Sequence, residues 1–223
     1  MAGAIGTGRG LIPALILSCM SKNFLDHAYD TEGTEATRRL YDDWAASYDA
    51  EVSENGYATP ERVARALHAV APNPEAPLLD FGCGTGLSGL ALRLAGFRTI
   101  DGADLSADML ELARGKELYR DLWQVDPDAG DPFEAGIYPL ITAIGVIGSG
   151  AAPVTLFDTL MRLLPQGGFF AFSFNDHTLQ DPAYEGRVNA WVDPGAARLH
   201  FREHGPHLPE RNINSTVYII EKT

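Results

Sequence analysis

Cysteine is scarce in this 223-residue chain, which has only Cys19 and Cys83 and no C-x-x-C pair. Two cysteines so far apart argue against a disulfide framework, and the sequence therefore predicts a protein of a reducing, cytoplasmic compartment. Long apolar runs are scarce as well. The stretch over residues 11–19 is too short to span a bilayer.

Basic residues are few compared with acidic ones. Lys and Arg total 17 against 30 Asp and Glu, so the formal net charge is -13 at pH 7. Surfaces that bind nucleic acid or anionic membranes need clustered Lys and Arg. The charge therefore predicts a small-molecule substrate, with no nucleic-acid partner and no membrane partner. The sequence leaves a monomer and a homodimer both open.

The first 20 residues differ from the rest of the chain. Arg9 precedes the short apolar run, and the four residues that end at Cys19 loosely match a lipoprotein cleavage box, so a secretory leader is one interpretation. The internal Pro13 and the single positive charge favour the other, an upstream start or a frayed extension before Met20. We therefore expect an N-terminal extension, partly disordered, over residues 1–33. Residues 34–223 are expected to form a single domain with a helical lid over residues 34–72.

The most informative stretch covers residues 78–89, with the sequence LLDFGCGTGLSG. Two leucines that end on Asp80 indicate the buried end of a strand. Gly82, Gly84 and Gly86 then allow positive φ and a close approach of a ligand to bare backbone. Apolar residues at i, i+3, i+4, i+7 and i+8 follow and predict a helix. The glycines therefore lie at a helix N-terminus, where backbone N–H groups are unpaired.

Two ligands fit a glycine turn of this kind, a dinucleotide and S-adenosylmethionine. Gly84, Gly86 and Gly89 also satisfy the dinucleotide pattern G-x-G-x-x-G. A carboxylate at Asp80 would repel a pyrophosphate, whereas S-adenosylmethionine has no phosphate and carries an ammonium and a sulfonium. The charge at the strand end therefore favours the sulfonium compound, and a nicotinamide-dependent oxidoreductase is the less favoured alternative.

The string over residues 79–86 resembles motif I of the class I S-adenosylmethionine-dependent methyltransferases, in which hydrophobic residues precede D-x-G-C-G-T-G. DFGCGTGLSGLAL, TIDGADLS and FSFNDHTLQDPAYE resemble the methyltransferase-like proteins of the Williams–Beuren syndrome chromosomal region protein 27 group, over residues 41–221. The resemblance implies an α/β fold with a Rossmann-like sheet, mostly parallel with an antiparallel C-terminal strand and helices on both faces. It also implies S-adenosyl-L-methionine as cofactor, S-adenosyl-L-homocysteine as product, and an unidentified small-molecule methyl acceptor.

The resemblance assigns cofactor-binding residues along the chain. Asp104 ends a predicted strand and would accept hydrogen bonds from the ribose hydroxyls, although it could also cap the following helix. Asp126 would meet the adenine amino group, unless it is one of several solvated loop carboxylates. Gly145 and Val146 lie near the end of an apolar strand predicted over residues 137–147 and would contact the methionine moiety. The full set, apart from the lid, is Asp80, Gly82, Cys83, Gly84, Thr85, Gly86, Asp104, Leu105, Met109, Asp126, Gly145 and Val146.

A polar helix is predicted over residues 34–50, with Leu40, Trp44 and Tyr48 on one face. Core packing of an amphipathic helix explains this face equally well. By the resemblance, the segment YDDWAASYD is instead a lid over the cofactor, in which Tyr41, Trp44 and Tyr48 bind the cofactor and exclude water. A second helix is predicted over residues 60–70, with Thr59 as its N-cap.

The second half of the chain predicts a helix over residues 154–164, a strand over 169–174, and an antiparallel pair near 198–204 and 215–222. His177 follows the strand and is a candidate general base, although a structural turn explains it better; Tyr48 is a second candidate. His200 and His204 would lie too far apart along a strand to share an ion, so no metal site is predicted. A non-catalytic cofactor-binding module remains an alternative to an enzyme.

Overall fold

A computed structural model describes residues 33–71, 73–126 and 129–223 of the chain. The extension expected over residues 1–33 lies outside this part of the chain except for Gly33, so that expectation and both interpretations of the first 20 residues stay predictions. Within the described ranges, no helix combines the length and the apolar character that a membrane crossing requires.

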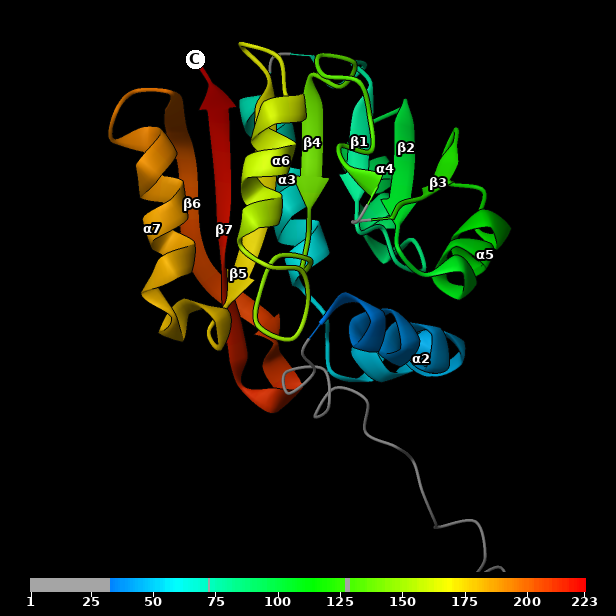
Figure 1. Cartoon of the computed structure of the whole chain (residues 1–223). Helices are drawn as coiled ribbons and strands as arrows, with labels where there is room; N and C mark the ends of the chain where they lie inside the picture. The colour runs from blue at the N-terminus through cyan, green and yellow to red at the C-terminus, as the bar shows by residue number, and fades with distance from the viewer. Residues whose placement is uncertain (1–32, 72, 127–128) are drawn as a thin grey trace, which may run out of the picture.

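The described residues build a seven-stranded sheet with the strand order β3-β2-β1-β4-β5-β7-β6 (Figure 1). Strands β1 to β5 pair in parallel, β7 runs antiparallel to β5, and β6 runs antiparallel to β7. The predicted mostly parallel sheet with an antiparallel C-terminal pair is thus confirmed. The strands are β1 (Leu78–Phe81), β2 (Ile100–Asp104), β3 (Leu122–Gln124), β4 (Leu140–Ala143), β5 (Phe169–Asn175), β6 (Ala197–Leu208) and β7 (Ile213–Lys222).

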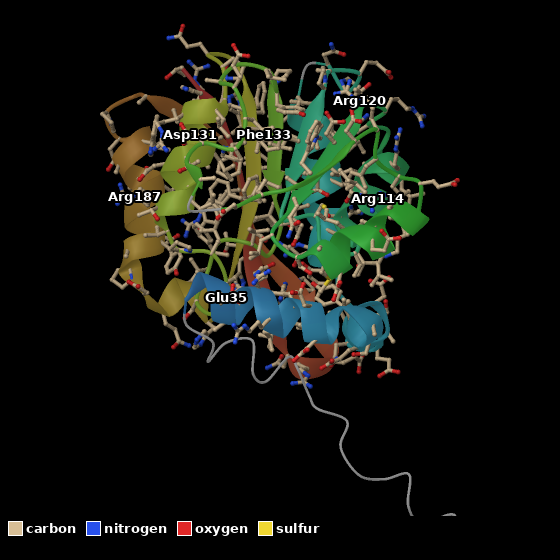
Figure 2. The ribbon with its side chains drawn as sticks, turned by 45° about the vertical axis from the view of Figure 1, so that its right-hand side comes forward. Glu35, Arg114, Arg120, Asp131, Phe133 and Arg187 are labelled. Atoms are coloured by element: carbon tan, nitrogen blue, oxygen red, sulfur yellow. The ribbon has the colours of Figure 1, made fainter. Side chains whose placement is uncertain are left out.

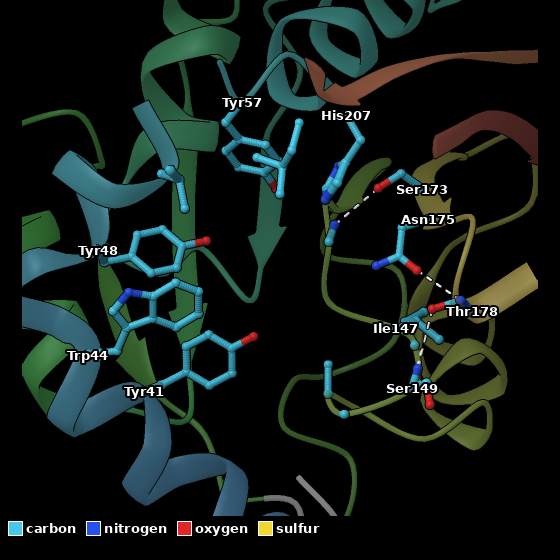
Figure 3. A pocket seen from close by; sticks show the side chains of 16 residues that line it. Tyr41, Trp44, Tyr48, Tyr57, Ile147, Ser149, Ser173, Asn175, Thr178 and His207 are labelled. Atoms are coloured by element: carbon cyan, nitrogen blue, oxygen red, sulfur yellow. Dashed lines mark hydrogen bonds between the residues drawn. The ribbon is translucent and has the colours of Figure 1, made fainter. Parts of the chain in front are cut away.

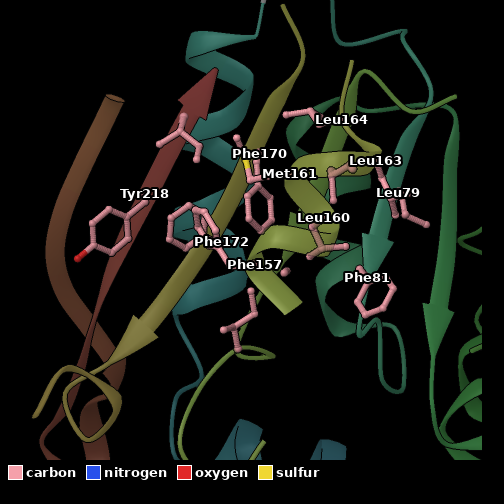
Figure 4. Packing of buried hydrophobic residues seen from close by; sticks show 14 of the residues in the cluster. Leu79, Phe81, Phe157, Leu160, Met161, Leu163, Leu164, Phe170, Phe172 and Tyr218 are labelled. Atoms are coloured by element: carbon pink, nitrogen blue, oxygen red, sulfur yellow. The ribbon is translucent and has the colours of Figure 1, made fainter. Parts of the chain in front are cut away.

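Helices pack on both faces of the sheet, as predicted. Successive side chains of a strand point to opposite faces, so Phe169 belongs to the cluster under α3 and α4, whereas Phe170 and Phe172 belong to the cluster under α6 and α7. The ring centroid of Phe157 lies 5.4 Å from that of Phe170 and 5.2 Å from that of Phe172 (Figure 4). The helices are α2 (Thr34–Glu54), α3 (Thr59–Val70), α4 (Leu87–Ala95), α5 (Ala107–Gly115), α6 (Thr155–Leu163) and α7 (Pro182–Val192).

Helix α2 lies across the carboxyl ends of the parallel strands, apart from the two packed layers (Figure 1). It extends four residues beyond the predicted end at residue 50. Trp44 and Val52 of α2 are buried together with Leu208 at the end of β6. The helix is therefore fixed to the antiparallel edge of the sheet at one end, and it roofs the edge where ligands of parallel α/β sheets bind.

Strand β4 and helix α7 differ most from the sequence prediction. Strand β4 is four residues long, not the eleven predicted over residues 137–147. The chain turns soon after its end because Gly145 adopts a φ of 71°. Helix α7 was not predicted at all, although its N-terminus carries a clear signal: the Asp181 side chain accepts a hydrogen bond from Ala183 N (2.8 Å), and Pro182 occupies the first helical position.

Many arginines on the outer surface form ion pairs, among them Arg114 and Arg187, which are labelled in Figure 2. Arg114 pairs with Glu111 at 2.6 Å, and Arg187 pairs with Asp158 at 3.0 Å. Exposed pairs of this kind contribute little stability. They do, however, neutralise cations that would otherwise be available to an anionic partner.

Candidate active site

The loop between β1 and α4 is shaped by three glycines with positive φ. The φ angles are 71° at Gly82, 53° at Gly84 and 96° at Gly86. A Cβ atom on Gly82 would lie 2.3 Å from Cγ2 of Val146, so packing requires this glycine. A Cβ atom on Gly84 would meet no atom within 4 Å. Open space therefore lies beside bare backbone at Gly84, and this is the fit that a ligand bound against the loop requires.

Asp80 lies behind this loop with no exposed surface. Its Oδ2 accepts hydrogen bonds from Ser88 Oγ (2.6 Å) and Tyr119 Oη (2.8 Å), and its Oδ1 accepts one from Thr142 Oγ1 (2.8 Å). Burial raises the pKa of this carboxyl, and the three hydroxyl donors oppose the rise. The carboxylate thus braces the strand end from inside, and direct binding of the cofactor by Asp80 stays a prediction.

Tyr119 is a supporting residue that sequence reasoning missed. Besides donating to Asp80, its hydroxyl accepts a hydrogen bond from Gly89 N (3.1 Å). A Cβ atom on Gly89 would lie 2.4 Å from Tyr119 Oη, so the third glycine of the dinucleotide-like pattern is needed for this contact. Its role is structural.

Asp104 lies at the end of β2, next to the glycine loop. Its Oδ2 accepts a hydrogen bond from Gly84 N (2.8 Å), and its Oδ1 accepts one from Ser106 N (2.9 Å). Burial raises the pKa of this carboxyl more than the backbone donors lower it. The carboxylate therefore ties the ends of β1 and β2 together at the predicted place, and its contact with ribose hydroxyls stays a prediction.

The other predicted adenosine contacts are more dispersed. Met109 is 1% exposed, inside the first turns of α5, and Leu105 is partly buried beside it. Asp126 is exposed, two residues beyond β3. None of the three lines either hollow described below. The structure does not bring them together with the glycine loop as closely as it brings Asp104.

The three predicted lid aromatics form one cluster on α2, in which Tyr41 stacks on Trp44 and Tyr48 meets Trp44 edge-on (Figure 3). The Trp44 ring centroid lies 5.7 Å from that of Tyr41 and 4.7 Å from that of Tyr48. Trp44 is 2% exposed, and its Nε1 donates to Glu51 Oε2 at 2.8 Å. Trp44 packs in a buried cluster, and all three rings line a hollow; their contact with the cofactor stays a prediction.

Carboxylates of α2 fasten the helix to the loops beneath it. Thr85 Oγ1 of the glycine loop and Lys116 Nζ both donate to Asp49, the lysine at 2.5 Å. Ser106 Oγ, the N-cap of α5, donates to Asp42. The Thr85 hydroxyl thus contacts α2, and the predicted contact of this residue with the cofactor stays a prediction. Helix α2 is thus held closed over the loops that follow β1 and β2.

Two neighbouring hollows lie under α2 and share Tyr48 and Tyr57. The smaller, about 270 Å³ including open space, borders the glycine loop from Gly82 through Thr85, with Cys83 among its lining residues. The larger, about 660 Å³ on the same measure, lies at the carboxyl ends of β4 and β5 (Figure 3). It is lined by Tyr41, Trp44, Tyr48, Val52, Tyr57, Gly145, Ile147, Gly148, Ser149, Gly150, Ala151, Ser173, Asn175, Thr178, His207 and Leu208.

Among the described residues, the titratable groups that line the larger hollow are three tyrosines and one histidine. Burial raises the pKa of Tyr48 well above its ordinary value, so this side chain stays a neutral phenol. Burial lowers the pKa of His207 to about 4, so its ring stays neutral and weakly basic. His177 is exposed and does not line the hollow. The placement of these residues favours neither predicted base, and both assignments stay predictions.

Curated relatives match a little more than half of the chain. Methyltransferase-like protein 27 of Homo sapiens is 32% identical over 131 residues, which cover 57% of this chain and 54% of that protein. The 18S rRNA (guanine(1575)-N(7))-methyltransferase of Saccharomyces cerevisiae is 33% identical over 138 residues, covering 56% of this chain and 50% of that protein. The chain thus spans about half the length of these curated relatives.

Solved structures match over more of the chain at lower identity. The [4+2]-cyclase SpnF has a TM-score of 0.64 at 12% identity, covering 86% of this chain and 97% of that one. Magnesium protoporphyrin IX methyltransferase from Synechocystis, with S-adenosylhomocysteine bound, has a TM-score of 0.58 at 16% identity, covering 80% and 87%. At such identities the likeness establishes the fold, which a cyclase and a methyltransferase share.

The prediction of a small-molecule substrate with no nucleic-acid partner is wrong. The yeast relative, and a relative from Dictyostelium discoideum named as a probable 18S rRNA (guanine-N(7))-methyltransferase, point to RNA. The prediction rested on net charge, which describes attraction between a whole surface and phosphate. It does not describe how a pocket binds one base.

The model of the methyltransferase domain family matches residues 55–217, from the end of α2 into β7. This range contains the glycine loop, Asp104 and much of the larger hollow. The predicted methyl transfer and its S-adenosylmethionine cofactor are thereby confirmed. The chain belongs to the methyltransferase domain family and is an S-adenosylmethionine-dependent methyltransferase.

Proposed function

We propose that this enzyme methylates a ring nitrogen of a purine base in RNA, with guanine N7 as the first candidate. The observation that carries the proposal is the larger hollow, whose described lining residues combine an aromatic wall with no group suited to remove a proton near neutral pH. Guanine N7 presents a lone pair and carries no proton, so its methylation needs no general base. The names of the yeast and Dictyostelium relatives support the same atom.

The aromatic wall suits both the substrate and the product of such a transfer. RNA-binding proteins recognise unstacked bases by stacking them on aromatic side chains, and Tyr41 and Tyr48 offer part-exposed rings of this kind, with the buried Trp44 between them. Methylation of N7 leaves the base with a positive charge. Aromatic faces attract a cation within about 6 Å of the ring centroid. The wall therefore favours the charged product and the transition state that leads to it.

The residues around the glycine loop would hold the cofactor. Bare backbone at Gly82, Gly84 and Gly86 would lie against it, Asp104 would accept from the ribose hydroxyls, and Gly145 would border the methionine end. When bound, S-adenosylmethionine supplies an electrophilic methyl group on a sulfonium. The chain's own part is to align the two reactants and to keep water out; Tyr48 of α2 borders both hollows, and Tyr41 and Trp44 border the larger one.

Methyl-labelled S-adenosylmethionine and a paired RNA substrate test the proposal. One RNA carries guanosine at a single-stranded position and the other carries 7-deazaguanosine there, which replaces N7 by C–H and keeps the other base atoms. We expect label in the first RNA and none in the second. Equal labelling of both RNAs, or labelling of a ribose hydroxyl, would contradict the proposal.

A further inference from the structure

His207 occupies an unusual backbone position at the rim of the larger hollow. In the pairing of β6 with β7, Pro206 pairs with Asn214 and Leu208 pairs with Ile213, so His207 is the extra residue of a β-bulge. Bulges next to active sites re-aim a side chain. The His207 carbonyl accepts a hydrogen bond from Ala58 N (3.0 Å), which fixes the bulge. The ring faces the hollow, opposite the aromatic cluster (Figure 3).

A chain of buried hydrogen bonds ends on this ring. Arg62 Nη1 lies 3.1 Å from Ser215 Oγ, Ser215 Oγ lies 2.9 Å from Thr59 Oγ1, and Thr59 Oγ1 lies 2.8 Å from His207 Nδ1. Thr59 and Ser215 have no exposed surface. The Arg62 guanidinium is itself held, because it donates to the backbone oxygens of Glu203, Pro206 and Ser215 at 2.9–3.1 Å.

The Arg62 guanidinium determines which atom donates and which accepts in each of these hydrogen bonds. Arg62 can only donate, so Ser215 Oγ accepts from it. If Ser215 then donates to Thr59, and Thr59 donates to His207 Nδ1, every hydrogen in the chain has an acceptor. If the chain ran the other way, Ser215 Oγ would accept twice and its own hydrogen would be buried without a partner within the described residues. The first arrangement leaves His207 Nδ1 unprotonated and puts the ring hydrogen on Nε2.

The Nε2 atom is the one open to the hollow. Every fully buried side-chain nitrogen and oxygen among the described residues has a partner, and Nε2 of His207 makes no hydrogen bond in that part of the chain. Nε2 is therefore accessible. Tyr57 packs edge-on against the ring, at 5.2 Å between centroids, and holds it in place. Burial, which lowers the pKa of His207 to about 4, keeps it neutral under physiological conditions.

We propose that His207 is a specificity-determining residue that presents a fixed Nε2–H donor to a carbonyl oxygen of the methyl acceptor, which in a guanine is O6. The identity of that oxygen rests on the proposed function, whereas the donor assignment depends only on this chain. Guanine carries O6 beside N7, and adenine carries an amino group there. An N–H donor can hydrogen-bond to O6 of guanine, whereas it would face the amino hydrogens of adenine, which are donors themselves. Thr59, Ser215 and Arg62 act as positioning residues because they select the ring tautomer.

Nitrogen NMR on the full chain, labelled with ¹⁵N-histidine and containing no RNA, tests the donor directly. The His207 signals, assigned by their loss in His207→Gln, should have the pattern of a ring protonated at Nε2. In Thr59→Val, which nearly preserves the side-chain shape and removes the hydroxyl, the tautomer should shift or become mixed. A wild-type ring protonated at Nδ1, or an unchanged pattern in Thr59→Val, would overturn the assignment.

Competition between two RNAs tests the oxygen. 2-Aminopurine keeps N7 and the 2-amino group of guanine but lacks O6. Wild-type kcat/KM should fall about tenfold or more when it replaces guanine, since the buried donor then loses its acceptor. His207→Phe should lose this preference, His207→Gln should keep part of it, and His200→Phe on the same strand should keep all of it. A wild-type enzyme indifferent to O6 would overturn the proposal. If no guanine RNA is methylated, the proposed function and the O6 assignment fail together, and the NMR pattern decides the donor alone.

Discussion

Replacing Asp49 with alanine removes the contacts that fasten α2 to the glycine loop. Asp49 accepts from the Thr85 hydroxyl and from the Lys116 ammonium. Thr85 is 1% exposed, so the variant leaves a buried hydroxyl without its acceptor. The Asp49 side chain is 41% exposed and that of Lys116 is 28% exposed. Solvent therefore screens the ion pair, which adds less than the hydrogen bond does.

These contacts set the expected size of the effect. A hydrogen bond to a charged group contributes about 1.5–3 kcal/mol, and a part-exposed ion pair adds about 0.2–1 kcal/mol. Taking the lower part of these ranges because of the exposure, we expect Asp49→Ala to weaken closure of α2 by about 2 kcal/mol, or about 30-fold. Val52 and Trp44 still anchor the helix in a buried cluster, so global unfolding should change much less.

Hydrogen exchange of the α2 amides measures this closure. Exchange in Asp49→Ala should be faster by up to the same 30-fold factor, and calorimetric affinity for S-adenosylhomocysteine should fall by no more than that factor. Asp43→Ala is the matched control, since it removes the same charge from an exposed position of the same helix. If α2 exchanges equally fast in both variants, the contacts of Asp49 do not hold the lid and this reasoning is wrong.

Four further predictions concern the cofactor, the buried histidine, the net charge and the C-terminal strand. Asp104→Asn should weaken S-adenosylhomocysteine binding by about 1–3 kcal/mol in a calorimetric titration, because the ribose hydroxyls lose a charged acceptor; wild-type affinity would remove Asp104 from the site. The folded pKa of His207, about 4, lies below its unfolded value, so the unfolded chain binds more protons and stability should fall as pH drops from 6.5 to 4, by up to about 3 kcal/mol; in His207→Phe, urea unfolding should lack this component. RNA affinity should depend little on salt, or rise with it, because the acidic surface repels phosphate; a steep fall would reveal a basic contact surface. Lys222→Met should lower stability by about 1–2 kcal/mol in thermal unfolding, since Nζ donates to Met161 O (2.7 Å) and Leu164 O (2.6 Å) at the end of α6; an unchanged melting temperature would show that this cap is dispensable.

The sequence was sufficient to predict features whose residues lie close together along the chain. The glycine loop could be read because its turn, its ligand space and the following helix all lie within a dozen residues. Asp104 could be placed because it ends a strand that pairs with β1. The lid aromatics could be grouped from helical periodicity. In each case neighbours in sequence are also neighbours in space.

The chain of bonds that ends at His207 had no such signal. Thr59 and Ser215 are separated by 156 residues, and they meet only because α3 packs against the antiparallel pair. Alternation along β6 could not give the direction of His207 either. The strand has two register shifts, with His200 and His207 as the extra residues, and each shift exchanges the faces of the side chains beyond it.

The acidic composition has different consequences at the outer surface and at the centre of the proposed reaction. Repulsion of phosphate acts at the outer surface, where arginines such as Arg114 and Arg187 are already paired with acidic residues. At the reaction centre the relevant charges are positive, because the methyl donor is a sulfonium and a methylated ring nitrogen is a cation. The carboxylates of Asp80 and Asp104 beside the glycine loop would lower the energy of the cationic donor, and the aromatic wall would attract the cationic product. Carboxylates on the outer surface thus oppose binding of an RNA backbone, whereas the two beside the glycine loop favour the chemistry proposed for one of its bases.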